Sequence, residues 1–343
     1  TDEETTIDMA ADEMLSKVTA ISDYAFAEHR EITSVTLPKG LKKMGKCAFK
    51  SCSKLTSIVI PEGITSIEEG SFGFCEGLTS VTIPGSVTSV GYATFSQCTN
   101  LAKITIPDKG LVTIGERAFS CPALKSFTIP TTVTSIEKWA FFDCQKLTSL
   151  VIPTTVRSIG EGAFANCKAI TSIIIPKGIT KIEDSTFMNC EALTSVTIPN
   201  TVTSIGSGAF SSCKSLPSIA IPNTVTNIGK SAFSSCSALK TFTFPDNNSI
   251  TSIEEKTFLA AGLTSITIPN TVKSIGDGAL AGCSALKSVT LKGGTPPTIN
   301  IKDWYGTFIN TELNAIYVPA NSVETYKKAD GWNKFADKIQ AIK

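Results

Sequence analysis

The chain has 343 residues, 42% of them hydrophobic and 18% charged, and its 31 Lys and Arg residues against 30 Asp and Glu residues give a net charge of +1. This length exceeds what one rounded core supports, so it indicates either several domains or an elongated repeat. A net charge near zero argues against a nucleic-acid partner and against binding to an anionic membrane, and no run of eighteen apolar residues is present to span a bilayer.

Residues 1–17 form an acidic segment that we expect to cap the N-terminal end of the core. In "TIDMAADEMLSKV" the apolar residues have helical spacing, which predicts a capping helix: Ile7, Ala11, Met14, Leu15 and Val18. The first residues lack the basic start and apolar centre of a signal peptide, so we expect a mature or trimmed chain.

Residues 18–292 repeat one phrase with a period of 23 residues. The phrase is clearest as "LTSVTIPNTVTSIGSGAFSSC", which begins at Leu193. Ten prolines mark the period: Pro38, Pro61, Pro84, Pro107, Pro130, Pro153, Pro176, Pro199, Pro222 and Pro245. A period of this length headed by Leu-x-x-Val-x-Ile is the signature of a leucine-rich repeat, whose units bury their apolar faces by stacking.

Each unit is predicted to hold two short strands and one tight turn. Val196 and Ile198 alternate with outward Ser195 and Thr197, as in a half-buried strand. A second extended stretch, "VTSIG", follows the proline, and "SGAFSSC" then suits one turn of α- or 3₁₀-helix that places Phe210 inside. We therefore predict a repeat solenoid, a right-handed leucine-rich-repeat coil that is mainly β with short helical or 3₁₀ turns. It has a parallel sheet on one face and helical caps at the ends.

Residues 293–343 depart from the repeat and are predicted to form an irregular last coil and a C-terminal cap. "GGTPPT" interrupts the pattern and "LNAIYVP" resumes it once. In "NSVETYKKADGWNKF" we expect helical segments, with Tyr326, Trp332 and Phe335 closing the core.

Two files of hydroxyl side chains are predicted on the outer face of the main sheet. The Ser file contains Ser34, Ser57, Ser80, Ser126, Ser149, Ser172, Ser195, Ser218 and Ser265, and the Thr file contains Thr36, Thr82, Thr105, Thr128, Thr197, Thr243 and Thr267. Because the files recur with the fold, they fit either a binding face or a plain role in solubility.

Departures from the phrase mark candidate contacts with a partner. Lys103 interrupts the Ser file, and Val151 and Ile174 interrupt the Thr file, where we expect them to be neighbours in an apolar spot. Trp139 and Phe142 occupy positions that are small or polar in the quoted unit. With Ser195 and Thr197 of the hydroxyl face, these residues are the candidate partner-binding set, because exposed aromatic residues are common at binding centres. Neutral drift and local packing are the alternative explanation.

Cysteine and histidine give little support to catalysis or to metal binding. Ten of the eleven cysteines recur at one place in the unit, which predicts a stack of buried thiols; Cys47 alone is out of phase, and a disulfide stays open as an alternative. No C-x-x-C pair is present, and the single histidine, His29, falls where other units carry Cys. We therefore expect no metal, no cofactor and no enzymatic activity.

The repeated phrase resembles the BspA-like bacterial surface antigens, whose leucine-rich repeat is of the treponemal type. The pattern L-x-x-[VI]-x-I-P-x-x-V-x-x-I-x-x-x-A-F-x-x-C matches from about residue 18 to 291. The resemblance implies a secreted or surface-anchored bacterial protein without catalytic residues, and adhesion to host extracellular-matrix proteins or to other cells. This chain shows no anchor or sorting signal.

The function expected from the sequence is a non-enzymatic, adhesin-like protein-binding module, extracellular or at a bacterial cell surface, and monomeric. Host extracellular matrix is the candidate partner. Two alternatives stay open: a structural spacer that projects another domain from the cell, and an ice-binding array of hydroxyls.

Overall fold

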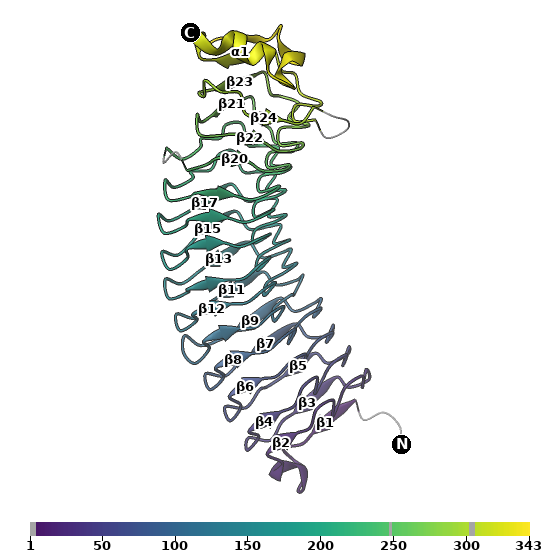
Figure 1. The fold of residues 1–343 in the computed structure, drawn as a ribbon. Helices are drawn as coiled ribbons and strands as arrows, with labels where there is room; N and C mark the ends of the chain where they lie inside the picture. Colours follow the sequence, from purple (N-terminus) through teal and green to yellow (C-terminus); the bar gives the residue numbers. More distant parts are fainter. Residues whose placement is uncertain (1–4, 247–248, 302–305) are drawn as a thin grey trace. The chain divides into compact units, whose positions relative to one another are not determined.

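The computed structural model describes residues 5–246, 249–301 and 306–343, which leaves residues 1–4 of the predicted N-terminal segment and 302–305 of the C-terminal one outside it. The chain divides into two units, Thr1–Thr171 and Ser172–Lys343. In each unit the backbone winds in successive coils, and most strands pair in parallel with their equivalents in neighbouring coils, in sheets of two to five strands (Figure 1). The predicted solenoid of parallel strands is confirmed.

The first strand of each coil contributes to the main sheet. In the first unit these strands are β1 (Thr6–Asp8), β3 (Ser34–Thr36), β5 (Ser57–Ile58), β7 (Ser80–Thr82), β9 (Lys103–Thr105), β11 (Ser126–Thr128) and β13 (Ser149–Val151). In the second unit they are β15 (Ser172–Ile174), β17 (Ser195–Thr197), β21 (Ser265–Ile268), β23 (Ser288–Leu291), β25 (Ala315–Val318) and β26 (Ile339–Ala341).

The second strand of each coil contributes to a narrower second sheet. Its members in the first unit are β2 (Ala20–Ile21), β4 (Lys43–Met44), β6 (Ser66–Ile67), β8 (Ser89–Val90), β10 (Thr113–Ile114), β12 (Ser135–Ile136) and β14 (Ser158–Ile159). In the second unit they are β16 (Lys181–Ile182), β18 (Ser204–Ile205), β19 (Asn227–Ile228), β20 (Ser252–Ile253), β22 (Ser274–Ile275) and β24 (Thr298–Ile299).

A turn segment, such as residues 206–213, closes each coil and differs from the single helical turn predicted for it. Bonds of the 3₁₀ kind are present, for example from the Cys213 N–H to the Phe210 carbonyl at 3.2 Å. However, Gly208 and Ser212 have φ values of 62° and 59°, in the left-handed region, which breaks any helix. The reason is that alternate N–H groups turn towards the next coil: that of Phe210 donates to the Ala232 carbonyl at 2.9 Å. The turn segments thus form a third ladder between coils.

Aromatic rings and thiols fill the interior of each unit in two columns. Stacked Phe rings have centroid distances such as 5.3 Å for Phe72 and Phe95 in the first unit and 5.7 Å for Phe210 and Phe233 in the second. The predicted inward residues of the quoted phrase are buried, except Val196, which is half-buried. Because every coil contributes the same apolar side chains, the core continues from coil to coil within a unit.

The N-terminal segment corrects the predicted capping helix. Residues 6–8 form strand β1, which pairs with β3, and only one 3₁₀ turn follows, η1 (Leu15–Lys17). Met14 is 80% exposed, whereas Met9, outside the helical pattern, is buried. Strand β3 has open backbone groups on that side, and a paired strand satisfies them where a helix would not.

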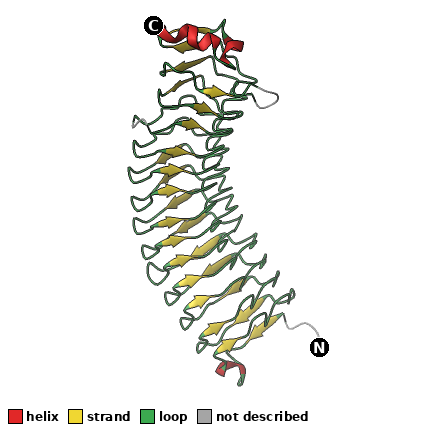
Figure 2. Cartoon of the chain, in the orientation of Figure 1, coloured by secondary structure: helices red, strands yellow, loops and turns green. Residues whose placement is uncertain are grey.

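The C-terminal end of the second unit carries the predicted helical cap, and Figure 2 shows the described helices only at the ends of the chain. It consists of η3 (Ala320–Ser322), α1 (Val323–Lys328) and η4 (Trp332–Phe335). Tyr326 and Trp332 are fully buried, and their polar atoms are satisfied: the Tyr326 hydroxyl donates to the Gly293 carbonyl at 2.8 Å and the Trp332 indole N–H to that of Pro297 at 2.7 Å. These two large side chains therefore close the core with their own polar atoms hydrogen-bonded.

The main sheet of the second unit is interrupted between β17 and β21. The equivalent residues, 218–220 and 241–243, are not in strand conformation. Pro217 stands where Thr264 stands in a regular coil, and the Thr264 N–H donates to the Lys240 carbonyl at 3.1 Å. Proline has no N–H for such a bond, so pairing fails where the strand should begin.

Candidate binding surfaces

The main-sheet face of the first unit carries Lys103 and Val151 as predicted. Both side chains are exposed, and Val151 is 78% exposed. Lys103 pairs in register with Ser80 and Ser126, and Val151 lies beside Thr128. Each therefore breaks a row of small hydroxyl residues with one longer or apolar side chain.

The main-sheet face of the second unit carries Ile174, Ser195 and Thr197. Ile174 is 70% exposed and pairs in register with Thr197, while Ser195 pairs with Ser172. Because Val151 and Ile174 belong to different units, the apolar spot that would join them stays a prediction.

Trp139 and Phe142 lie in a turn segment, on a different part of the coil from the main-sheet candidates. Their rings meet edge to face at a centroid distance of 5.3 Å, and both are half-buried. The Arg117 guanidinium lies 5.7 Å from the centroid of the Trp139 ring and 5.5 Å from that of Phe142. We call these three residues the Arg117 cluster; its contacts are of the cation–π and T-shaped kinds.

Trp139 occupies a turn position that is left-handed in coil after coil, for example at Ala93, Arg117 and Ser185. Its φ of 57° is left-handed, a region that costs a residue with a Cβ about 1–2 kcal/mol. The next coil has Gly162 at the same place, and a Cβ there would lie 2.1 Å from the Trp139 ring. The indole thus packs directly against a glycine, and this contact fixes its position on the surface.

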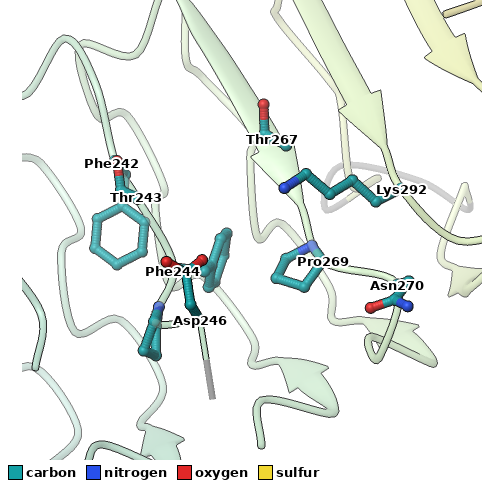
Figure 3. A pocket seen from close by; sticks show the side chains of 9 residues that line it. Phe242, Thr243, Phe244, Asp246, Thr267, Pro269, Asn270 and Lys292 are labelled. Carbon is teal, nitrogen blue, oxygen red and sulfur yellow. The ribbon is translucent and has the colours of Figure 1, made fainter. Parts of the chain in front are cut away.

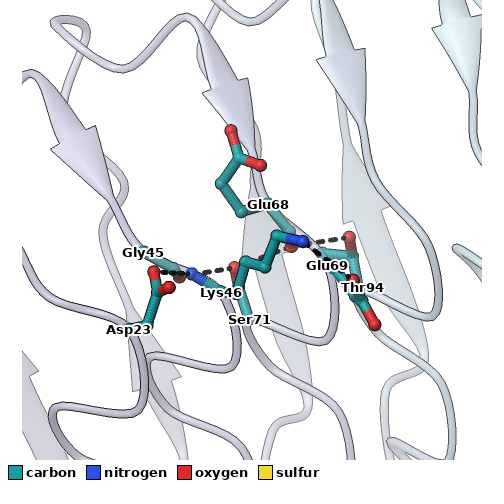
Figure 4. A network of polar contacts seen from close by, with 7 residues as sticks. All are labelled: Asp23, Gly45, Lys46, Glu68, Glu69, Ser71 and Thr94. Carbon is teal, nitrogen blue, oxygen red and sulfur yellow. Dashed lines mark hydrogen bonds and ion pairs between the residues drawn. The ribbon is translucent and has the colours of Figure 1, made fainter.

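A row of charged residues borders the turn segments of the first unit (Figure 4). Lys46 donates its backbone N–H to Asp23 at 2.8 Å and its ammonium pairs with Glu69 at 3.4 Å. Lys138 and Glu161 repeat this pairing farther along at 2.7 Å. These pairs are largely exposed, so each contributes at most about 1 kcal/mol to stability.

A pocket of about 420 Å³, here named the Tyr92 pocket, lies beside the Arg117 cluster in the first unit. Four coils line it: Cys47 and Lys50 from one, Glu69, Gly70, Gly73 and Phe74 from the next, Tyr92, Ala93 and Ser96 from the third, and Arg117 from the fourth. Sequence reasoning missed Arg117, Tyr92 and Phe74. The available signal was the appearance of large side chains in consecutive units at turn positions where the quoted phrase has Gly and Ser.

A second pocket, of about 340 Å³, lies in the second unit where the main sheet is interrupted (Figure 3). Phe242 and Phe244 turn into the core beside Phe258, while Thr243 and Asp246 face Thr267 and Lys292 across the opening. The pocket follows from the lost strand pairing, because coils that do not pair leave a gap between them.

All eleven cysteines are free thiols and are buried. Nine are seen to donate from Sγ to the carbonyl of the Phe in the preceding coil, for example Cys98 to Phe72 at 3.1 Å. Burial raises the pKa of Cys52 to about 11 and the pKa values of Cys98, Cys236 and Cys283 to about 12. These thiols are therefore structural donors and poor nucleophiles at neutral pH.

No group of three or more His, Cys, Asp or Glu side chains in the described ranges is arranged to hold a metal ion. Within the same ranges, no helix has both the length and the apolar character that crossing a membrane requires. His29 is exposed in the first coil.

Comparison with known proteins places the repeat in a family. The model of the BspA type leucine rich repeat region, in six copies, matches residues 19–148, 112–220, 135–253 and 203–329. Curated proteins give no match.

Solved structures share the fold. A leucine-rich repeat protein from Bacteroides ovatus is 25% identical, with a TM-score of 0.63 over 95% of this chain and 88% of that one. A leucine rich cell surface protein from Faecalibacterium prausnitzii is 28% identical, with a TM-score of 0.55 over 85% of this chain and 89% of that one. The pneumococcal vaccine antigen PcpA, at 21% identity, has a TM-score of 0.56 over 94% and 83% of the two chains.

Proposed function

Because the chain belongs to the BspA-type leucine-rich repeat family, we propose that it is a non-enzymatic, adhesin-like module that binds protein partners outside the cell or at a bacterial cell surface. The similarity to a protein described as a cell surface protein supports this location. Neither the family description nor the structural neighbours name a catalytic activity. The proposed partner class is host extracellular-matrix protein, bound by a monomer without a cofactor.

The observation that carries the proposal is the Arg117 cluster. Trp, Tyr and Arg dominate the binding energy of protein interfaces, and a preorganised side chain loses little entropy when it binds. Trp139 is held against Gly162, Arg117 and Phe142 although its backbone conformation would suit glycine better. The left-handed conformation belongs to the turn of many coils, so the support for this site comes from the ring contacts that hold the half-buried indole at the surface.

The main-sheet candidates form a second, separate part of the proposal. Val151 and Ile174 present apolar side chains among hydroxyls, and Lys103, Ser195 and Thr197 present polar ones. Because these residues and the Arg117 cluster lie on different parts of the coil, substitutions separate the two surfaces.

The test is solid-phase binding of the full chain to fibronectin, fibrinogen, laminin and collagen. We expect saturable binding to at least one, weakened about tenfold or more by W139G with F142S, which restores the Gly and Ser of the quoted phrase. The variants V151K and I174K, made singly, test the main-sheet face. Unchanged binding by W139G with F142S would remove the Arg117 cluster from the site.

A folded chain that binds none of the four would instead favour the spacer. Thermal hysteresis on the same sample tests the ice-binding alternative, for which the main-sheet hydroxyls are the candidate array.

A further inference from the structure

The Tyr92 pocket combines two exposed aromatic rings with a floor of small residues. Phe74 is 45% exposed and Tyr92 47% exposed, and Gly70, Gly73 and Ala93 lie in the same lining. A Cβ added to Gly73 would meet its neighbours at an ordinary 3.5 Å. The equivalent residue is large in some coils, as with Lys50, Phe142 and Met188, and is Ser or Ala in others, such as Ser211. The fold therefore tolerates a larger side chain at this place, and Gly73 leaves that space open in the lining of the pocket.

The charged groups of the pocket leave positive charge to be balanced. Glu69 is already paired with Lys46 at 3.4 Å. Lys50 forms no ion pair with any residue of the described ranges, and Arg117 forms one long ion pair, from its Nε to Glu116 Oε1 at 3.9 Å. An anionic group that enters here meets two cations, and a guanidinium suits a carboxylate because it can donate two parallel bonds.

The backbone beneath the pocket is already used between coils. The N–H groups of Cys47, Gly70 and Ala93 donate to the carbonyls of Glu69, Tyr92 and Glu116 in the next coil, at 2.8 Å in each case. An extended peptide that adds to a sheet edge needs free backbone groups of this kind. Recognition here must therefore come from side chains, namely rings, two cations, a carboxylate and the hydroxyl of Ser96.

The geometry points to a binding site for an acidic sugar, a uronic or sialic acid, in the Tyr92 pocket. The apolar face of the sugar ring packs on Tyr92 and Phe74, its carboxylate pairs with Lys50 and Arg117, and its hydroxyls bond to Glu69 and Ser96. The volume of about 420 Å³ falls within the range of about 300–1,000 Å³ typical of small-molecule sites. This site goes beyond the protein binding proposed above and shares only Arg117 with the Arg117 cluster.

Two rival ligands fit less well. A nucleotide would bring a phosphate with more negative charge close to Glu69, and no ring pair with Phe74 or Tyr92 is formed in the described structure to hold a flat base between two faces. An acidic peptide would lack the backbone partners described above.

The experiment measures binding of glucuronic acid and sialyllactose, each beside its neutral match, glucose or lactose, by saturation-transfer NMR and calorimetry. The key variant is G73M, which fills the pocket with a side chain that Met188 shows is accepted at this place in the coil. Ser211→Met, at the same place in a coil of the second unit, is the matched control. Circular dichroism and thermal unfolding establish that both variants fold.

We expect one acid to bind at least about tenfold more tightly than its neutral match, with affinity that falls as salt is added. Y92A and G73M should each weaken binding about tenfold or more, and Ser211→Met should not. Equal binding of acid and neutral sugars, no binding of either acid, or a G73M variant that binds like the parent would overturn the proposal. So would preferential binding of AMP or of a glutamate-rich peptide in the same assay. Y92A and G73M leave Arg117, Trp139 and Phe142 in place, so loss of sugar binding in these variants with matrix-protein binding unchanged distinguishes failure here from failure of protein binding.

Discussion

Two turn segments, residues 137–144 in the first unit and 206–213 in the second, share their inward residues and differ in their outward ones. Phe141 and Phe210 are equally buried, as are Cys144 and Cys213. Outside, Trp139 and Phe142 stand where the other segment has Gly208 and Ser211. The comparison teaches that packing fixes the inside of every coil, whereas the outside is free to carry a binding site.

The buried thiols that the two segments share should make the free energy of unfolding fall at alkaline pH. The folded-state pKa values of Cys52, Cys98, Cys236 and Cys283 are raised from 9.0 to about 11 or 12, so between those limits the unfolded chain has lost protons that the folded chain keeps. Stability is therefore full below pH 9 and falls as pH rises towards 11–12, by about 1.4 kcal/mol per pH unit for each thiol. The loss of stability from the four thiols together should be larger than the loss expected from any single substitution described below.

Urea unfolding from pH 8 upward measures this slope. The variant Cys98→Ala should reduce the slope of the free energy of unfolding against pH by the contribution of one thiol. Cys47→Ala, which lies outside the column of recurring cysteines, serves as the comparison. A free energy of unfolding that stays level from pH 9 to 11 would contradict the thiol assignment.

Removing one buried ring from the Phe column should lower the free energy of unfolding more than removing a ring at the surface. Phe210→Ala leaves a cavity between Phe187 and Phe233, whose centroids lie 5.5 and 5.7 Å from that of Phe210, and should cost about 3–5 kcal/mol. Phe142→Ala, on the outside, should cost about 1 kcal/mol. Chemical denaturation followed by circular dichroism separates the two, and equal losses would mean that inside and outside do not differ in the way described.

Converting one segment towards the other should change binding with little effect on stability. Trp139→Gly loses ring contacts but relieves the left-handed strain at φ 57°, so the free energy of unfolding should stay within about 1 kcal/mol of the parent value. The matrix-protein assay should show the loss. The reverse change, Gly208→Trp, introduces the strain without Arg117 and should destabilise by about 1–3 kcal/mol; a neutral outcome there would show that Trp139 is not strained.

The smallest expected effect concerns the interrupted sheet. Pro217→Thr restores an N–H at the start of the strand, but it also gives flexibility back to the unfolded chain, so stability should change by less than about 1 kcal/mol. Hydrogen exchange should nevertheless slow at residues 218–220. If it does not, the rings of Phe242 and Phe244, rather than Pro217, keep the coils from pairing.

Periodicity made most of the coil predictable, because an apolar residue that recurs every 23 positions can only face a shared core. Phe210, Cys213 and Ile205 were placed inside for this reason, and all are buried. The N-terminal helix was wrong because the spacing of Ile7 and Val18 carries no information about the open edge of β3, which β1 covers.

The binding surfaces were less predictable, because they depend on the direction in which each side chain extends towards the neighbouring coil. Trp139 and Phe142 stood out as departures, but Arg117 becomes their neighbour only through the left-handed turns that set its direction. The Tyr92 pocket depends on what is missing at Gly73, and an absent side chain leaves no signal in a periodic pattern.

The thiol hydrogen bonds give each stack of coils a direction. Every one of those described runs from a later coil to the coil before it. The first coil has His29 at the place, exposed, and the first thiol of the column, Cys52, donates to Phe26 within it. A cysteine at this position therefore indicates that its coil packs on a preceding coil, whose Phe carbonyl accepts the hydrogen bond from the thiol.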